Sequence, residues 1–259
     1  MGFLKNGVTA HRGNLAQLLE NAMSAFIGTV SIEVDWIEAD IRETADGKLV
    51  VIHDDNTKRL ATHNLSIKNV TYAELKAIDI THQFRYTNQL TTEQCPKLSI
   101  PLLSDVINLM KSQGLTKTQH FTRLSIHPKV DCIDQTIQLI ENMNAAIWVG
   151  FNDSNWENLQ RIRAWNSEIP VFWDRPADND INNDIETAKK LGIKNIIIQQ
   201  TGITPSKVKS VHNAELEIGA WTVNNPSTME KLLKLGIDRI YTDCPINLLV
   251  IKNQDATIK

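Results

Sequence analysis

The feature that most constrains the fold is an alternation of short apolar segments with longer segments of helical period. Several apolar segments are rich in β-branched residues and bounded by turn residues, as at 195–199 and 218–223. The pattern predicts nine strands, at residues 7–10, 34–41, 49–53, 121–127, 146–151, 169–173, 195–199, 217–223 and 239–242. It predicts helices between them, at about 22–31, 104–113, 131–143, 154–165, 183–191, 205–213 and 227–235. Alternating strands and helices favour parallel strands joined by right-handed crossovers.

The second and third predicted strands are too close in sequence for such a crossover. The connection ends at Lys48 and contains Asp46-Gly47, a strong signal for a tight turn. A parallel crossover needs a dozen or more residues, so we expect an antiparallel hairpin here. Eight strands then remain, which is the number in a closed (β/α)8 TIM barrel. An open doubly wound sheet is the alternative fold.

The chain length of 259 residues suits one large domain. Barrels of this class commonly reach about 250 residues, so we expect residues 1–259 to form a single barrel domain. Residues 54–100 form an insertion between the second and third barrel strands, with one short predicted helix at 72–78. We expect this insertion to lie at the C-terminal mouth of the barrel, where the sites of such enzymes lie.

Composition excludes several classes of function. A net charge of −3 provides no basic field for nucleic acid. The sequence has no run of about 18 apolar residues, so we expect no stable membrane insertion. No signal peptide is recognisable after Met1. The three cysteines are widely spaced, which indicates neither disulfides nor a cysteine metal site. We therefore expect a cytoplasmic protein, and no feature predicts a protein partner.

Titratable residues gather at the ends of the first predicted strands. His11, Arg12 and Gly13 directly follow the first strand, where a histidine can move protons and an arginine can grip a phosphate. Glu38 and Asp40 alternate along the second strand, so their carboxylates project to one face and suit a hard divalent cation.

The hairpin brings a second histidine toward this group. If Asp46-Gly47 is the centre of the turn, Asp40 lies opposite His53 on the returning strand. Glu38, Asp40 and His53 then share one face, and His11 lies on the neighbouring barrel strand. Two histidines that flank two carboxylates indicate an acid–base pair around a metal site.

Ordered motifs over most of the chain resemble the glycerophosphodiester phosphodiesterase family. They are H-R-G at 11–13, L-E-N-A in place of P-E-N-T at 19–22, E-x-D with T-x-D-G at 38–47, V-V-x-H-D at 50–54, P-x-L at 101–103, W-T-V-N at 221–224 and T-D-x-P at 242–245. That so many motifs occur in order makes a chance resemblance improbable. The barrel fold of that family agrees with the strand count.

The resemblance implies roles for individual residues. His11 and His53 would be general acid and base, and Arg12 and Lys129 would contact the substrate phosphate. Glu38 and Asp40 would hold one divalent cation, Mg²⁺ or Ca²⁺. Trp221 would line the alcohol-binding part of the pocket, although a core position is an equally good interpretation of that residue.

One departure from the family pattern affects the metal site. Where the family has E-x-K, this chain has His127 and Lys129, so the third carboxylate is missing. His127 can itself bind the cation and shift preference toward Mn²⁺, Fe²⁺ or Zn²⁺. Two carboxylates and waters can instead hold the metal more weakly, or the site has lost catalysis and kept binding.

The first functional hypothesis is metal-dependent hydrolysis of small glycerophosphodiesters to glycerol-3-phosphate and an alcohol, a reaction of lipid metabolism. The nucleophile can be water or a neighbouring hydroxyl of the substrate. Cleavage of a lysophospholipid headgroup is a second hypothesis, disfavoured because residues 54–100 are mostly polar. A catalytically silent binding protein is the third, and only His127 supports it.

Overall fold

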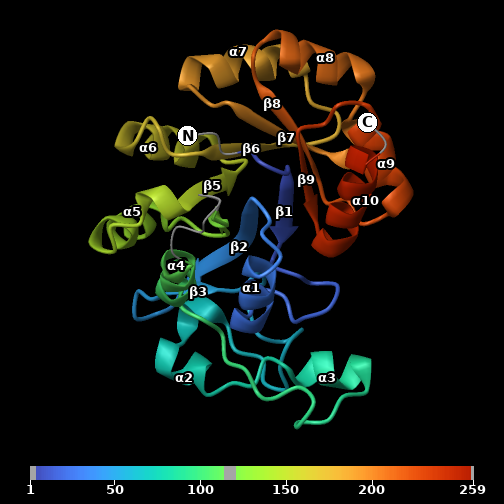
Figure 1. Ribbon diagram of the computed structural model, residues 1–259. Coiled ribbons are helices and arrows are strands. Elements are labelled where there is room, and N and C mark those ends of the chain that lie inside the picture. The colour runs from blue at the N-terminus through green and yellow to red at the C-terminus, as the bar shows by residue number, and fades with distance from the viewer. Residues whose placement is uncertain (1–3, 114–120, 258–259) are drawn as a thin grey trace.

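Eight parallel strands close into a ring in the computed structural model, which describes residues 4–113 and 121–257 (Figure 1). The ring strands are β1 (Val8–His11), β2 (Trp36–Glu43), β4 (Arg123–Pro128), β5 (Val149–Asp153), β6 (Val171–Arg175), β7 (Asn195–Gln199), β8 (Glu217–Trp221) and β9 (Arg239–Thr242). β1 pairs in parallel with both β9 and β2, and this pairing closes the ring. The predicted barrel is confirmed, and the open sheet is wrong.

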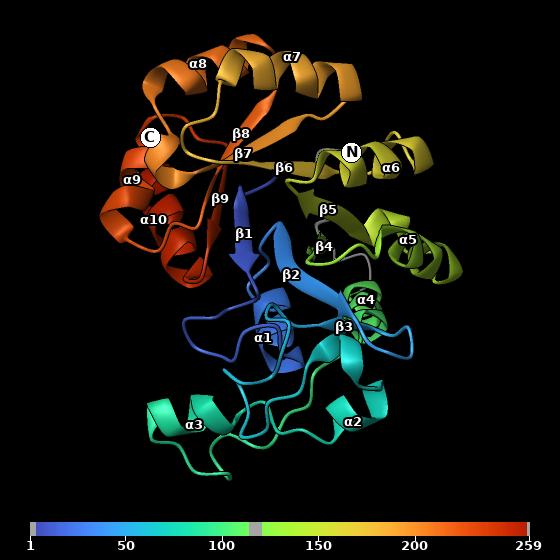
Figure 2. The ribbon, with the colours of Figure 1, turned by 180° about the vertical axis from the view of Figure 1, so that it is seen from behind.

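Helices surround the ring on its outside (Figure 2). They are α1 (Met23–Val30), α4 (Leu103–Ser112), α5 (Ile133–Asn142), α6 (Trp156–Trp165), α7 (Ile181–Leu191), α8 (Pro205–Asn213), α9 (Pro226–Lys234) and α10 (Pro245–Thr257). Single 3₁₀ turns lie between strands and helices of the barrel, at η2 (Ala146–Trp148) and η3 (Gln200–Gly202), and in the insertion, at η1 (Ile67–Asn69). The seven predicted helices are present within a few residues, whereas α10 was not predicted. Across the described residues, no helix combines the length and apolar character needed to span a bilayer.

β3 (Leu49–Val51) runs antiparallel to β2 and lies outside the ring, as predicted for the hairpin. Its register differs by one residue from the predicted one, because Ile41 pairs with Val51 and Ile52 N donates to Asp40 O at 3.0 Å. Asp40 therefore lies opposite Ile52, and the predicted pairing with His53 is wrong. The cause is the turn, in which Thr44 N bonds Lys48 O and encloses three residues rather than two.

The insertion contains two helices, α2 (Tyr72–Lys76) and α3 (His82–Asn88). Only α2 was predicted, because α3 is polar and buries none of its residues. The insertion packs in a second apolar cluster, in which Leu60, Ile67, Leu75, Ile80 and Ile100 of the insertion meet Leu19, Ala22, Val50 and Ile52. Figures 1 and 2 both place α2 and α3 beyond α1 and β3, to one side of the ring.

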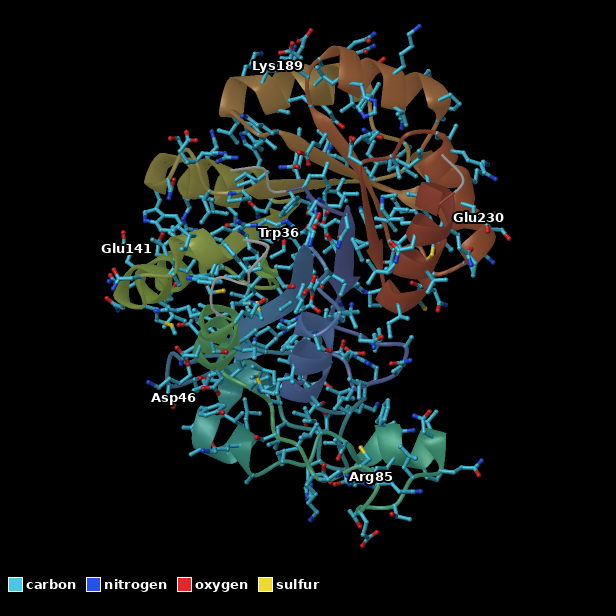
Figure 3. All side chains as sticks on the ribbon, in the orientation of Figure 1. Trp36, Asp46, Arg85, Glu141, Lys189 and Glu230 are labelled. Atoms are coloured by element: carbon cyan, nitrogen blue, oxygen red, sulfur yellow. The ribbon has the colours of Figure 1, made fainter. Side chains whose placement is uncertain are left out.

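A layer of large side chains fills the barrel interior below the mouth. Trp36, Phe172, Ile197 and Tyr241 form this layer, and Trp221 packs on it. The rings of Trp36 and Phe172 meet edge to face with centroids 4.9 Å apart. Figure 3 places Trp36 within the ring, whereas Glu141, Lys189 and Glu230 lie on the outer helices. The layer closes the barrel below, so inward side chains nearer the strand ends form the floor of a site.

Candidate active site

A cavity of about 570 Å³ opens at the carboxyl ends of the strands. That volume lies within the range of pockets that hold small molecules. Seven of the eight predicted site residues line it, namely His11, Arg12, Glu38, His53, His127, Lys129 and Trp221. The eighth, Asp40, is fully buried directly behind this surface.

His11 is the last residue of β1 and belongs to a chain of hydrogen-bonded side chains. Its Nδ1 lies 2.7 Å from Asp243 Oδ1, and Asn224 Nδ2 donates to Asp243 Oδ2 at 2.5 Å. Burial by itself would lower the pKa of His11, but the Asp243 hydrogen bond and the charge of Glu38 outweigh it and raise that pKa. Asn224 of the W-T-V-N motif and Asp243 of the T-D-x-P motif thus orient His11. The sequence did not suggest this role.

Arg12 has a left-handed backbone with φ of 56°, which is uncommon for a residue other than glycine. The next residue, Gly13, also has positive φ, and a Cβ there would lie 2.8 Å from that of Ala25. The bend turns the Arg12 guanidinium inward, where Nε lies 3.0 Å from Asp40 Oδ2 and Nη1 lies 3.1 Å from Glu20 Oε1. Arg12 therefore has a fixed position at the edge of the cavity.

Glu38, Asp40 and His127 form a compact buried cluster. Asp40 pairs with His127 in the β2–β4 register, and His127 Nδ1 lies 3.2 Å from Glu38 Oε1 and 3.8 Å from Asp40 Oδ1. One ligand atom from each residue lies within 4.8 Å of the others. Two buried carboxylates and an imidazole at this separation are a donor set that fits a divalent cation.

Positive charges balance these carboxylates. Lys129 Nζ lies 3.0 Å from Asp40 Oδ1 and 3.0 Å from His127 Nδ1. Burial would raise the pKa of Asp40, but Lys129, Arg12 and His127 hold it well below its ordinary value. Burial would likewise lower the pKa of His127, yet the hydrogen bond and charge of Glu38 raise it. Asp40 is therefore an anion throughout the physiological pH range.

His53 lies just after β3, at the start of the insertion. Its Nδ1 lies 2.7 Å from Asp54 Oδ1, so both predicted acid–base histidines have an aspartate partner. Arg59 Nε donates to Asp54 Oδ2 at 2.6 Å, and its two terminal nitrogens each donate to Glu20 at 2.7 Å. Glu20 also accepts from Arg12, so an ion-pair network connects His53 with Arg12.

Two polar residues on the opposite wall were not predicted. Asn152 on β5 is buried, and its Nδ2 donates to Asp174 Oδ2 on β6 at 2.6 Å. Burial raises the pKa of Asp174 to about 6. Both residues line the cavity together with Trp221. Both residues lie near the end of a strand, and that position is the signal that the sequence offers. Only the register of β5 and β6 shows that their side chains face inward.

The chain is similar to known proteins over almost its whole length. The sequence model described as "Glycerophosphoryl diester phosphodiesterase family" matches residues 11–247. A glycerophosphodiester phosphodiesterase of Bacillus altitudinis is 26% identical over 254 residues, which are 95% of this chain and 98% of that protein. A human lysophospholipase D is 29% identical over 173 residues, 63% of this chain and 50% of that protein.

Solved structures agree with the fold. A phosphodiesterase of Oleispira antarctica, in complex with the product sn-glycerol-3-phosphate, superposes with a TM-score of 0.80 at 24% identity, covering 99% of this chain and 98% of that one. A glycerophosphodiester phosphodiesterase of Thermotoga maritima has a TM-score of 0.72 at 21% identity, covering 95% and 97%. The chain belongs to the glycerophosphoryl diester phosphodiesterase family and is a phosphodiesterase.

Proposed function

We propose that this enzyme hydrolyses glycerophosphodiesters to glycerol-3-phosphate and an alcohol with His11 and His53 as its acid–base pair. The observation that carries the proposal is that both histidines line one cavity with Glu38 and His127. His11 has Asp243 on its Nδ1, and His53 has Asp54. An aspartate on Nδ1 orients the ring and leaves Nε2 for proton transfer. Such transfer accelerates a reaction by typically ~10²–10⁴-fold per group.

Glu38, Asp40 and His127 would hold the divalent cation. A cation bound there stabilises negative charge that develops on the phosphoryl oxygens. Arg12 and Lys129 line the same cavity and would contact those oxygens, since each carries more N–H donors than its pairing with Asp40 uses. The two carboxylates suit Mg²⁺ or Ca²⁺, and the imidazole favours Mn²⁺ or Zn²⁺.

We also propose that residues 1–259 work as one domain, with 54–100 at the mouth of the barrel. Support comes from Arg59, which reaches Glu20 beside Arg12. Cys95, Cys132 and Cys244 are free, which supports a cytoplasmic location.

Metal-stripped protein tests the function with glycerophosphocholine and glycerophosphoethanolamine, after refilling with Mg²⁺, Ca²⁺, Mn²⁺ or Zn²⁺ in separate samples. We expect turnover that depends on the metal and falls at least ~10²-fold in His11→Ala. The variant His127→Glu restores a third carboxylate, and we expect it to move the preference toward Mg²⁺ or Ca²⁺. Metal-independent turnover, or full activity of His11→Ala, would contradict the proposal.

Two alternatives are decided by the same assay. The similarity to a human lysophospholipase D favours lysophospholipids as a second substrate class, which would appear as faster turnover of lysophosphatidylcholine than of glycerophosphocholine. The histidine at position 127 favours a silent binding protein. That alternative predicts no turnover with any metal and a gain of activity in His127→Glu.

A further inference from the structure

The wall of the cavity formed by β5 and β6 carries two buried hydrogen-bond acceptors that the protein leaves unused. Among residues 4–113 and 121–257, no group hydrogen-bonds Asn152 Oδ1 or Asp174 Oδ1. Asn152 Nδ2 donates to Asp174 Oδ2 at 2.6 Å, so the amide turns its nitrogen toward the carboxylate and leaves its oxygen as an acceptor. Buried polar atoms in proteins nearly always have partners, so the pair indicates a group that binds in the cavity and donates hydrogen bonds.

The two acceptors lie in the electrostatic field of the cluster formed by Glu38, Asp40 and His127. Burial has the largest influence on the pKa of Asp174, and the charges of His127 and Glu38 also act on it. Both acceptor residues line the same cavity as Glu38 and His127. Asp174 does not belong to the set whose ligand atoms lie within 4.8 Å of one another. Its carboxylate is therefore near the cation site but outside the group that would bind the cation directly.

The charge of that group explains why a further anion is needed. Lys129 Nζ lies 3.0 Å from Asp40 Oδ1, and Arg12 Nε lies 3.0 Å from Asp40 Oδ2. These two cations balance the two carboxylates of the cluster, so the group offers a divalent cation no net negative charge. Asp174 is bonded by a neutral amide rather than by a cation, and it adds one negative charge beside the cluster. Affinity for a hard cation depends on how much negative charge its site carries.

Water on a bound cation has the hydrogen-bonding chemistry that the wall requires. A cation with three protein ligands keeps water or substrate in its remaining coordination positions. Such water directs an oxygen lone pair at the metal and its hydrogens outward, so it needs acceptors around it. Asn152 Oδ1 and Asp174 Oδ1 are two acceptors on one wall beside the cation site.

Building on the proposed phosphodiesterase function, we propose that Asp174 and Asn152 form an outer wall of the cation site, which accepts hydrogen bonds from water on the cation and sets its affinity. Asp174 on β6 thereby supplies a negative charge that the imidazole at position 127 does not. Groups that hydrogen-bond the ligands of a metal from outside typically change its affinity by roughly 10- to 100-fold.

Binding of Mn²⁺ to metal-stripped protein tests the role of Asp174 without turnover. Electron paramagnetic resonance of free Mn²⁺ gives the Kd at pH 8, where Asp174 is an anion because burial raises its pKa only to about 6. We expect Asp174→Asn to raise this Kd roughly 10- to 100-fold. Asp178→Asn is the matched control, because it makes the same chemical change on an exposed side chain of the same loop, and its Kd should equal that of wild type.

Urea denaturation without metal separates this role from a structural one. The amide introduced by Asp174→Asn can still accept the hydrogen bond from Asn152, and the substitution removes a buried charge that no cation contacts. We therefore expect the metal-free variant to be at least as stable as wild type. Saturating Mn²⁺ should stabilise wild type more than the variant at equal Mn²⁺ concentration, since the variant binds it more weakly.

Other outcomes overturn the role of Asp174. They are an unchanged Kd in Asp174→Asn, an equal rise in Asp178→Asn, or a rise in Kd with a matching loss of stability in the metal-free variant, which would assign Asp174 to the fold. Failure of the proposed function appears differently, as wild type that binds Mn²⁺ but turns over no glycerophosphodiester. The effect of Asp174→Asn on the Kd would still decide the role of Asp174 in that case.

Discussion

The two walls of the cavity differ in whether the protein itself supplies opposite charges for their polar groups. On the β1–β2 wall, formed by Arg12, Glu20 and Asp40 with Lys129 and Arg59 against them, buried charges lie within 3.1 Å of opposite charges. On the β5–β8 wall, formed by Asn152, Asp174 and Trp221, each residue has a buried polar atom without a hydrogen-bond partner among residues 4–113 and 121–257. Arg12 Nε and Asp40 Oδ1 on the first wall also lack a well-formed hydrogen bond, but both lie within 3.0 Å of an opposite charge. The first wall is organised before a substrate binds, whereas the second depends on what binds.

This difference connects stability with function. A preorganised charged wall stabilises developing charge without reorganisation during the reaction. A wall with unsatisfied atoms is completed only by what binds in the cavity, because those atoms otherwise stay buried and unpaired. We infer that the β1–β2 wall serves the chemistry directly, whereas the β5–β8 wall acts through what the cavity holds.

The comparison predicts its largest effect at Asp40. Asp40→Asn removes the anion between Arg12 and Lys129, so Lys129 loses its carboxylate partner and Arg12 loses one of two. Metal-free protein should therefore lose roughly 3 kcal/mol of unfolding free energy. Urea denaturation monitored by circular dichroism measures this loss. Asp178→Asn makes the same chemical change on an exposed side chain and should stay within about 0.5 kcal/mol of wild type. Equal stability of the two variants would mean that the β1–β2 wall is not held by its charges.

A smaller loss of unfolding free energy is expected at Arg59, whose side chain is half exposed. Arg59→Met removes its hydrogen bonds to Glu20 and Asp54 and should cost about 1–2 kcal/mol at pH 7. Burial would raise the pKa of Glu20, but Arg59 and Arg12 lower it from its ordinary 4.5. The stabilisation is therefore present above pH 4.5 and is lost as the pH falls through the lowered pKa.

Urea titrations of wild type and Arg59→Met at several pH values measure that dependence. The difference between them should be largest near neutral pH and should shrink in acid. Arg59→Lys keeps the charge without the paired geometry, and its stability should lie between the two. A difference that grows in acid would contradict the assignment to Glu20.

A substitution at Asp243 is expected to change the proton affinity of His11. Asp243→Asn replaces the carboxylate that raises the pKa of His11, so that pKa should fall. Titration of the histidine ring resonances by nuclear magnetic resonance in metal-free protein measures the shift. The circular dichroism spectrum of the variant should match that of wild type, which shows that the fold is kept. An unchanged His11 would mean that Asp243 contributes only to position.

The smallest effect is predicted on the β5–β8 wall. Trp221→Phe removes an N–H group that has no hydrogen-bond partner in the part of the chain that the structure describes. Stability in urea should therefore stay within about 0.5 kcal/mol of wild type. A gain in stability would agree with the removal of a buried N–H donor that makes no hydrogen bond. A loss above 2 kcal/mol would show that the indole is needed for packing, and the contrast between the walls would then fail.

The sequence predicted the barrel and most of the β1–β2 wall because both depend on local patterns. Strand alternation placed Glu38 and Asp40 on one face, and the position after the first strand placed His11 and Arg12 at the mouth. The register of the hairpin was missed because a turn of three residues and one of two have the same sequence signal at Asp46-Gly47. One residue of slip changes which side chains face each other.

Contacts between distant segments could not be predicted in this way. Arg59 meets Glu20 across 39 positions of sequence, and His11 meets Asp243 across 232. Asn152 and Asp174 could not be told apart from other polar residues of their strands until the register fixed which ones face inward. Long-range pairing of this kind is set by the closed ring rather than by any local pattern.

The hairpin strand β3 has a consequence for how the enzyme loses activity. His11 belongs to the closed ring, while His53 follows a three-residue strand outside the ring. His53 is continuous with an insertion that packs in a second apolar cluster, separate from the main core. Proteins open in cooperative units with separate free energies, and segments outside the main core open first. Opening of residues 53–100 would displace His53 and leave the barrel folded. With His53 in the acid–base pair proposed above, we expect inactivation at a denaturant concentration below that of global unfolding.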